Sequence, residues 1–381
     1  MHGPVLSKLF RLFDLIAKEA SQSEKTELYC DFVSRLYQCG GDLGKHLKRE
    51  IMQSENVLIK ETCAKRPVPD FIKAAAKNEL SAFSDLSAID INALRFAVSE
   101  EHADLLPNFC SKHYDFTELY KNRLAISDRT GYGAFSENAM FYFDGNGLCP
   151  YEFPDKTDIN SLFGYDSQRE IVMKNTLALA RGEKAANILL CGDAGTGKSS
   201  TVKAVANALF KDGVRLCEIK KDQLEMLPRL VGILSKNPLK FIIFIDDLSF
   251  NKNDDSFGML KAALEGSAFS RAQNTVIYAT SNRRHLIKES FSDREGDDIH
   301  AADTAAELMS LSQRFSLNIL FEKPSKALYL DIVQKICQIQ NVPVSERLLL
   351  SAEQFALKKG GRSARAAEQF VGLYKILGED F

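Results

Sequence analysis

The stretch NILLCGDAGTGKSS, residues 187–200, constrains the fold more than any other part of the chain. Residues 192–199 fill every fixed position of the phosphate-loop pattern G-x-x-x-x-G-K-[ST]. Glycines allow backbone amides to curl around phosphate oxygens, and the helix that follows directs its positive end at the same anion. The stretch therefore predicts a buried strand, a phosphate-binding loop and an amphipathic helix in succession.

The loop supplies most of the predicted nucleotide contacts. We expect Lys198 to reach the β and γ phosphates and the Ser199 hydroxyl to hold Mg²⁺. The predicted nucleotide-binding residues of the loop are Gly192, Asp193, Ala194, Gly195, Thr196, Gly197, Lys198, Ser199 and Ser200. Upstream, Phe163 and Tyr165 flank a turn before the preceding helix, where they could pack on an adenine ring. A place in the hydrophobic core is the alternative for both.

A second apolar run, FIIFIDDLSF at residues 241–250, ends in two carboxylates. Asp246 is the candidate for binding Mg²⁺ through water, and Asp247 for orienting or deprotonating the attacking water. Asn282 follows a later strand, where it could hydrogen-bond the γ-phosphate or that water; a simple turn residue is the alternative. Together with the loop, these residues predict a site for Mg²⁺ and a nucleotide.

Five apolar runs alternate with helical patterns between residues 187 and 321: NILLC, VRLCEI, FIIFID, NTVIYAT and LNILF. Such runs are typical of a parallel sheet that is covered on both faces and binds ligands at the carboxyl ends of its strands. The predicted fold class is α/β, a P-loop NTPase with a five-stranded parallel sheet flanked by helices, a C-terminal helical lid and an N-terminal helical domain.

The predicted domains are an N-terminal helical domain at 1–126, a hairpin or linker at 127–155, the nucleotide-binding α/β domain at 156–323 and a helical lid at 324–381. In the first domain, two helical patterns each place apolar residues on one face. These residues are Leu6, Leu9, Phe10, Phe13 and Ile16, then Leu28, Phe32, Val33, Leu36 and Tyr37. The core of a helical bundle explains them best, and a partner-binding groove is the alternative.

The composition narrows the class of protein. A chain of 381 residues can form two or three domains, and its net charge of −2 creates no overall attraction to nucleic acid or to an anionic membrane. The eight cysteines have irregular spacing without a C-x-x-C pair, as expected of reduced thiols in the cytoplasm. No apolar stretch approaches the ~18 residues of a membrane span. We expect a cytoplasmic protein without a membrane partner.

Four further motifs accompany the loop: DDLSF at 246–250, ATSNRRHL at 279–286, DREGDDIHAAD at 293–303 and SLSQRF at 310–315. With them, residues 156–381 resemble an AAA+ ATPase, and in particular a bacterial AAA+ family catalogued only as a domain of unknown function. That family is similar to initiator and helicase-loader-like AAA+ proteins.

The resemblance implies roles for single residues. Asn282 would be the sensor-one residue, and Arg365 in SARAAEQF would be the sensor-two arginine that points to the phosphates. Arg314 in SQRF falls where initiator-type relatives carry an arginine finger for the neighbouring subunit's γ-phosphate, and Arg294 is a second candidate. Most AAA+ proteins carry glutamate where this chain has Asp247. The shorter side chain implies slow turnover, because a displacement of about 1 Å can cost ~10²-fold in rate.

The function expected from these features is Mg²⁺-dependent binding and hydrolysis of ATP by an oligomeric remodelling ATPase. It would act as a homo-oligomer on an unidentified protein or nucleic-acid partner. The alternative is a switch or scaffold that is gated by nucleotide and hydrolyses it slowly or not at all. Residues 251–254 spell the guanine-reading string N-K-x-D, but they follow the acids too closely for a GTPase. A mixed-charge insert at 286–309 is the expected site of a subunit or partner contact.

Overall fold

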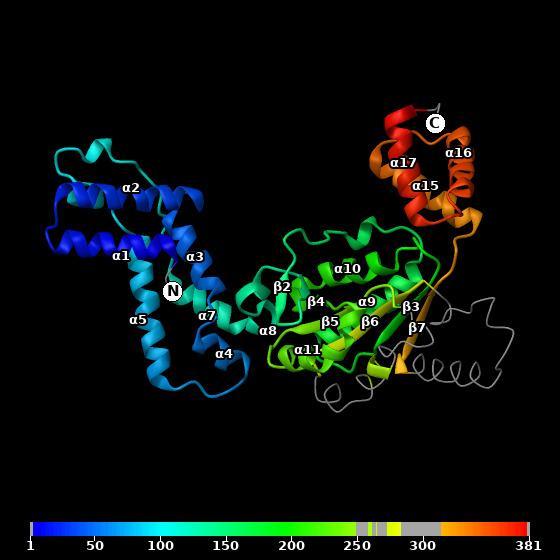
Figure 1. The fold of residues 1–381 in the computed structure, drawn as a ribbon, viewed down its shortest axis with the longest axis horizontal. Coiled ribbons are helices and arrows are strands. Elements are labelled where there is room, and N and C mark those ends of the chain that lie inside the picture. The colour runs from blue at the N-terminus through cyan, green and yellow to red at the C-terminus, as the bar shows by residue number, and fades with distance from the viewer. Residues whose placement is uncertain (1–2, 249–257, 261–263, 265–272, 283–313, 379–381) are drawn as a thin grey trace. The chain divides into compact units, whose positions relative to one another are not determined.

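The computed structural model describes residues 3–248, 258–260, 264, 273–282 and 314–378 (Figure 1). Contacts within the chain divide it into two compact units, Met1–Glu137 and Asn138–Phe381. Arg294, the N-K-x-D string and the mixed-charge insert lie outside the described residues.

The first unit is built from helices. They are α1 (Pro4–Ala17), α2 (Gln22–Gln38), α3 (Leu43–Gln53), α4 (Val57–Cys63), α5 (Asp70–Ser87), α6 (Ile91–Val98), α7 (Phe116–Ala125) and α8 (Ser127–Thr130), with 3₁₀ turns at Ala103–Leu105 and Gly133–Ser136. A capping box between Ser21 and Glu24 starts α2, since each side chain accepts a hydrogen bond from the other residue's backbone amide. The helices enclose one apolar core.

The predicted helix faces of this unit are partly wrong. Leu6, Leu9, Phe32 and Leu36 are fully buried, but the side chains of Phe10 and Tyr37 are 42% and 53% exposed. In α1 the core is completed by Val5 and Leu12 instead. An amphipathic helix has a broad apolar stripe, so its borders depend on which neighbouring helix covers them.

The second unit contains a seven-stranded sheet of order β2-β1-β4-β5-β6-β3-β7 among the described residues. Its strands are β1 (Met140–Phe143), β2 (Leu148–Pro150), β3 (Ile188–Gly192), β4 (Val214–Glu218), β5 (Lys240–Ile245), β6 (Thr275–Ser281) and β7 (Leu317–Phe321). Every neighbouring pair is parallel except β1 and β2. The five predicted apolar runs all form strands, at β3 to β7.

The predicted strand count of five is too low. The hairpin of β1 and β2 extends the sheet, because β1 pairs in parallel with β4 through Phe141 and Cys217. Three of its side chains, Met140, Phe141 and Phe143, are buried. The segment that the sequence assigned to a hairpin or linker is therefore a hairpin that belongs to the sheet.

Helices cover the sheet and join its strands. They are α9 (Asp166–Ala180), α10 (Lys198–Ala208) and α11 (Leu227–Leu234), and Figure 1 shows α10 and α11 on opposite sides of the sheet. Parallel pairing brings the carboxyl ends of β3, β5 and β6 to one edge: Tyr278 of β6 pairs with both Ile188 of β3 and Phe244 of β5. This edge is where polar side chains follow the strands.

The last three helices form a bundle with its own apolar core. They are α15 (Lys326–Gln340), α16 (Glu346–Lys358) and α17 (Ala364–Leu377). Before α17, the Nε atom of Arg362 donates to both carboxylate oxygens of Glu353, at 2.9 and 3.1 Å, and the Nη2 atom also contacts this carboxylate. This pair ties the loop before α17 to α16. Across the part of the chain that is described, no helix is both long and apolar enough to cross a membrane.

The pair between Arg362 and Glu353 predicts a pH-dependent stability of this bundle. The guanidinium lowers the pKa of Glu353 below its ordinary value of 4.5. A depressed pKa stabilises the fold above the unfolded-state value, and this contribution is lost as the pH falls through the folded-state value. Glu353→Gln should therefore lower the free energy of unfolding by roughly 1 kcal/mol near neutral pH. The difference should shrink below about pH 4.

Hydrogen exchange of α16 and α17 would measure this effect. The exposed Glu346, in the first turn of α16, provides a control, and Glu346→Gln should change exchange much less. Equal protection of wild type and Glu353→Gln near neutral pH would contradict the assigned role.

Candidate nucleotide site

The loop between β3 and α10 has the backbone that its glycines permit. Gly192 and Gly197 adopt φ values of 137° and 88°, which side chains rarely tolerate. A Cβ atom on Gly192 would lie 2.0 Å from the carbonyl oxygen of Phe321 in β7. Gly192 therefore has to be glycine for two reasons, its φ value and the close approach of β7. Gly197 caps the start of α10, which begins at Lys198.

Lys198 is enclosed within the loop and is only 5% exposed. Its Nζ atom donates to the carbonyl oxygens of Gly192 and Asp193, at 2.9 and 2.7 Å, and to the Oδ1 atom of Asn282, at 3.1 Å. Burial lowers the pKa of Lys198, while the nearby carboxylates oppose that shift. The ammonium thus lies at the centre of the loop, held by oxygens that a phosphate oxygen could replace.

The Ser199 side chain meets the first carboxylate at the end of β5. Its hydroxyl donates to the Oδ1 atom of Asp246 at 2.6 Å. The Thr280 hydroxyl, in β6, donates to the same Oδ1 atom at 2.6 Å. The start of α10, the residue after β5 and the end of β6 therefore supply one cluster of oxygens.

The second carboxylate is held differently. The Nδ2 atom of Asn282 donates to the Oδ1 atom of Asp247 at 2.7 Å. Since the Oδ1 atom of Asn282 accepts from Lys198, this one amide bridges the lysine and the acid. Asp247 has a φ of 52°, in the left-handed region that costs an ordinary residue about 1–3 kcal/mol. Such strain is found where the surroundings fix a functional side chain.

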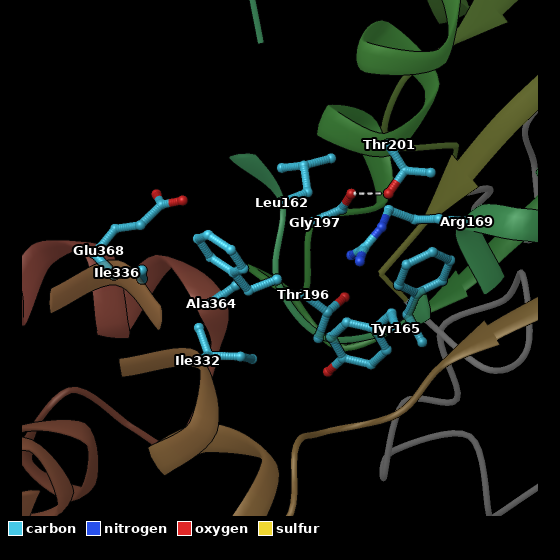
Figure 2. Close-up of a pocket in the computed structure, with 12 residues that line it drawn as sticks. Leu162, Tyr165, Arg169, Thr196, Gly197, Thr201, Ile332, Ile336, Ala364 and Glu368 are labelled. Atoms are coloured by element: carbon cyan, nitrogen blue, oxygen red, sulfur yellow. Dashed lines mark hydrogen bonds between the residues drawn. The ribbon is translucent and has the colours of Figure 1, made fainter. Parts of the chain in front are cut away.

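A pocket opens beside the loop, between the sheet and the last three helices (Figure 2). Its apolar lining includes Phe163, Tyr165, Phe321, Ile332, Ile336 and Ala364. Thr196 and Gly197 of the loop line one side of it, so a group bound there would adjoin a phosphate in the loop. Both predicted aromatic residues line the pocket, although Tyr165 is only 8% exposed. The Tyr165 hydroxyl donates to the carbonyl oxygen of Glu322 at 2.5 Å.

The first turn of α17 contacts the loop directly. The backbone amide of Arg365 donates to the carbonyl oxygen of Gly195 at 3.2 Å. The Arg365 side chain is exposed, and it makes no ion pair with any described residue. Arg362, one turn away in sequence, is committed to Glu353. Of the two arginines, Arg365 is therefore the one without an ion-pair partner among the described residues.

Most of the predicted site residues come together at this edge. Ser200 follows Ser199 in α10 and is half-buried. Asp193 and Ala194 form the exposed tip of the loop. Arg314 is the exception: it precedes β7, whereas the loop aligns with the other end of that strand through the pairing of Gly192 with Phe321. Arg314 and the phosphate loop therefore lie at opposite ends of β7, and the strand between them is about 13 Å long.

Sequence reasoning missed three polar residues of the site. Thr280 contacts the acids and lies two residues before Asn282, so strand alternation could have placed both on one face. Arg169 and Glu368 line the pocket from α9 and α17, and no local sequence pattern marks either residue. The Nη1 atom of Arg169 contacts the carbonyl oxygen of Gly164, and the Nη2 atom contacts the Asp166 carboxylate.

The oxygen cluster fits Mg²⁺. This ion prefers oxygen ligands and keeps several waters, so a hydroxyl and one or two carboxylates suffice. A serine hydroxyl has one proton and two lone pairs. The Ser199 proton is directed at Asp246, which leaves the lone pairs of Ser199 available to a cation.

One comparison with known proteins identifies a family for most of the second unit. Residues 136–378 match the model of a family described as "Protein of unknown function (DUF815)". The search of curated proteins found no match.

Several solved structures are similar at low identity. DnaA from Aquifex aeolicus bound to AMPPCP has 15% identity and a TM-score of 0.41, over 60% of this chain and 68% of that chain. The FIGL-1 AAA domain in complex with ADP has 16% identity and a TM-score of 0.40, over 60% and 77%. The RuvB branch migration motor from Thermotoga maritima has 13% identity and a TM-score of 0.33, over 59% and 74%. Similarity at this level assigns neither an activity nor a partner to this chain.

The close approach of Gly192 to β7 predicts a large effect of the smallest substitution. Gly192→Ala should lower the free energy of unfolding by roughly 3 to 5 kcal/mol, because it adds both backbone strain and a clash. Gly197→Ala is the matched control: its φ is also positive, but nothing lies within 4 Å of the added Cβ atom. That change should cost about 1–2 kcal/mol. Urea unfolding would measure both, and equal losses would contradict the packing argument.

Proposed function

Since the chain belongs to the family described as "Protein of unknown function (DUF815)", we propose its function from the geometry of the site. We infer that it is an AAA+ protein that binds ATP with Mg²⁺ and hydrolyses it slowly. The observation that supports this most directly is the convergence of Lys198, Ser199 and Asp246 at one edge of the parallel sheet. Lys198 and Ser199 begin the helix after β3, and Asp246 follows β5 on the other side of β6. These three residue types at one edge of a sheet are what a Mg²⁺-nucleotide site requires.

Each residue has a proposed task. Lys198 would exchange its bonds to loop carbonyls for the β and γ phosphate oxygens. Mg²⁺, when bound by Ser199 and by Asp246 through water, would neutralise charge on those oxygens. Asp247 would orient or accept a proton from the attacking water, with Asn282 beside it. Phe163 and Tyr165 would form the apolar walls around the base, and Arg365 would reach the phosphates from the lid.

Slow turnover follows from the way Asp247 is held. Its carboxylate is shorter than the glutamate of most AAA+ proteins and is bound by Asn282 in this structure. A general base that spends a lone pair on an amide donor is less free to accept a proton from water. Nucleotide would have to draw Asn282 away before Asp247 can act.

The position of Arg314 supports an oligomer. Arg314 precedes β7, whereas its own phosphate loop aligns with the far end of that strand, about 13 Å along it. We propose that Arg314 serves the γ-phosphate of a neighbouring copy of the chain, which would make turnover depend on assembly. A homo-oligomer of this kind could remodel a protein or a nucleic acid, and the first unit is a candidate for contact with that partner.

A nucleotide-gated switch is the second candidate function. The specific observation in its favour is a chain of two hydrogen bonds, from Lys198 to Asn282 and from Asn282 to Asp247. This chain occupies the lysine and the acid with Asn282. In a switch, ATP binding would break this bridge and change the lid, while hydrolysis would act only as a timer.

The site predicts a separation of binding from chemistry. Lys198→Ala should weaken ATP binding about 10- to 100-fold, because it removes charged hydrogen bonds to phosphate. Asp247→Asn should leave affinity within about twofold but lower turnover ~10²-fold or more, because the amide cannot accept the proton. Calorimetry would give the affinities and phosphate release the rates.

Lys203→Ala provides the matched control for the lysine, since Lys203 lies on the same helix outside the site. Wild-type turnover by Asp247→Asn would remove Asp247 from the mechanism. Unchanged affinity in Lys198→Ala would overturn the nucleotide site itself.

The finger proposal predicts complementation between two inactive variants. Arg314→Ala should lower turnover ~10³-fold or more while ATP binding persists. Mixed with Lys198→Ala, which keeps the finger but lacks a working site, it should regain part of the activity. A mixed interface is complete when the intact site of Arg314→Ala faces the intact arginine of Lys198→Ala. Turnover per chain should also rise with protein concentration as the mass in solution increases.

No recovery on mixing, together with a monomeric mass and turnover indifferent to Arg314, would refute the oligomeric ATPase. The nucleotide-gated switch would then be the better account.

A further inference from the structure

Thr280 makes three contacts with the acid segment that follows β5. Its hydroxyl donates to the Oδ1 atom of Asp246 at 2.6 Å and accepts from the backbone amide of Asp247 at 2.9 Å. Its carbonyl oxygen accepts from the backbone amide of Leu248 at 2.6 Å. One residue of β6 therefore binds three consecutive residues of the neighbouring segment, and this side chain is 2% exposed.

We propose that Thr280 is a positioning residue for the metal and for the general base of the proposed ATPase. The proposal rests on that function, because it assigns Thr280 a task toward the same Mg²⁺ and the same attacking water. In this proposal, the Thr280 hydroxyl holds Asp246 toward the metal and Asp247 toward the attacking water.

The first step of the argument concerns Asp246. Its Oδ1 atom accepts from two hydroxyls, those of Ser199 and Thr280, and from the amide of Asp247 at 3.2 Å. Among the described residues, its Oδ2 atom has no hydrogen-bond donor. With three donors on Oδ1, the Oδ2 atom would be the oxygen available to a metal-bound water when Mg²⁺ is present, and the three hydrogen bonds oppose rotation of the carboxylate.

The second step concerns Asp247. Its amide is held by the Thr280 oxygen, and the residue takes the left-handed φ of 52°. Aspartate adopts this conformation more readily than most residues, and here the contact with Thr280 fixes it. The side chain accepts a hydrogen bond from Asn282, which lies two residues beyond Thr280, just past the end of β6. Thr280 thus holds Asp246, Asn282 holds Asp247, and their two-residue spacing keeps the acids in separate places.

A buried threonine in the same unit, Thr176, offers a matched control. The Thr176 hydroxyl in α9 donates to the carbonyl oxygen of Val172 at 2.8 Å and contacts the Tyr278 hydroxyl at 2.8 Å. It is as buried as Thr280 but makes no contact with the acids. Thr176→Val therefore reproduces the loss of a buried hydroxyl without touching the site.

The test uses the full chain with ATP and Mn²⁺, whose binding is followed by electron paramagnetic resonance, and with Mg²⁺ for turnover. Thr280→Val should raise the metal concentration needed for half-maximal binding about tenfold and lower kcat about 10- to 100-fold. Affinity for ATP without metal should stay within about twofold. Thr280→Ser, which restores the hydroxyl, should recover both values to within about threefold, and Thr176→Val should change neither.

Three results would overturn the proposal. If Thr280→Val keeps wild-type metal binding and kcat while Asp246→Ala loses them, the site stands but Thr280 does not position it. If Thr280→Ser fails to restore what Thr280→Val loses, shape rather than the hydroxyl is responsible. If the wild type itself binds neither ATP nor Mn²⁺ with ATP, the proposed function fails, and the role of Thr280 fails with it.

Discussion

The parallel register of β3, β5 and β6 is the constraint on which the candidate site depends. Ser199 and Asp246 are 47 residues apart in the chain, and Lys198 and Asn282 are 84 apart, yet each pair is hydrogen-bonded. These contacts exist because three strands end at the same edge. A slip of two residues in one strand would move a side chain by about 7 Å and break them, although the apolar alternation would survive. The buried core of the sheet therefore also aligns the polar groups.

The polar groups at this edge of the sheet form hydrogen bonds with one another. Lys198 is compensated by two carbonyl oxygens and an amide, and the two acids by hydroxyls, an amide and backbone donors. A buried ammonium without such partners would be costly. The arrangement also means that a phosphate must replace existing bonds rather than enter an open space. Under the proposed function, part of the binding free energy is thus spent on releasing Asn282 and Asp247.

The strands from β3 to β7 and the loop could be predicted because each is a local pattern of apolar runs, glycines and acids. The sequence left residues 127–155 as a hairpin or a linker, because Gly, Asn, Asp and Pro interrupt short aromatic runs. Only the pairing of β1 with β4 shows that the hairpin belongs to the sheet. Thr280 was missed because threonine is an ordinary strand residue, so its hydroxyl carries no signal without the neighbouring strand. For the pocket, the sequence suggested Phe163. It gave no means to find Ile332, which lies far along the chain in α15 and lines the same pocket.

The contact between α17 and the phosphate loop joins the last three helices to the segment that would bind the phosphates. The amide of Arg365 donates to Gly195, and a Cβ atom on Gly195 would lie 3.1 Å from the Ser363 hydroxyl, so the two segments pack with little space between them. The pocket has walls from both the sheet side and the lid, as Figure 2 shows for Tyr165 and Ile332. A base bound there would contact both parts, and a phosphate in the loop would act on Gly195. A ligand shifts an equilibrium only by its differential affinity for two states. Under the proposed function, these shared walls would therefore allow nucleotide to change the position of the last three helices.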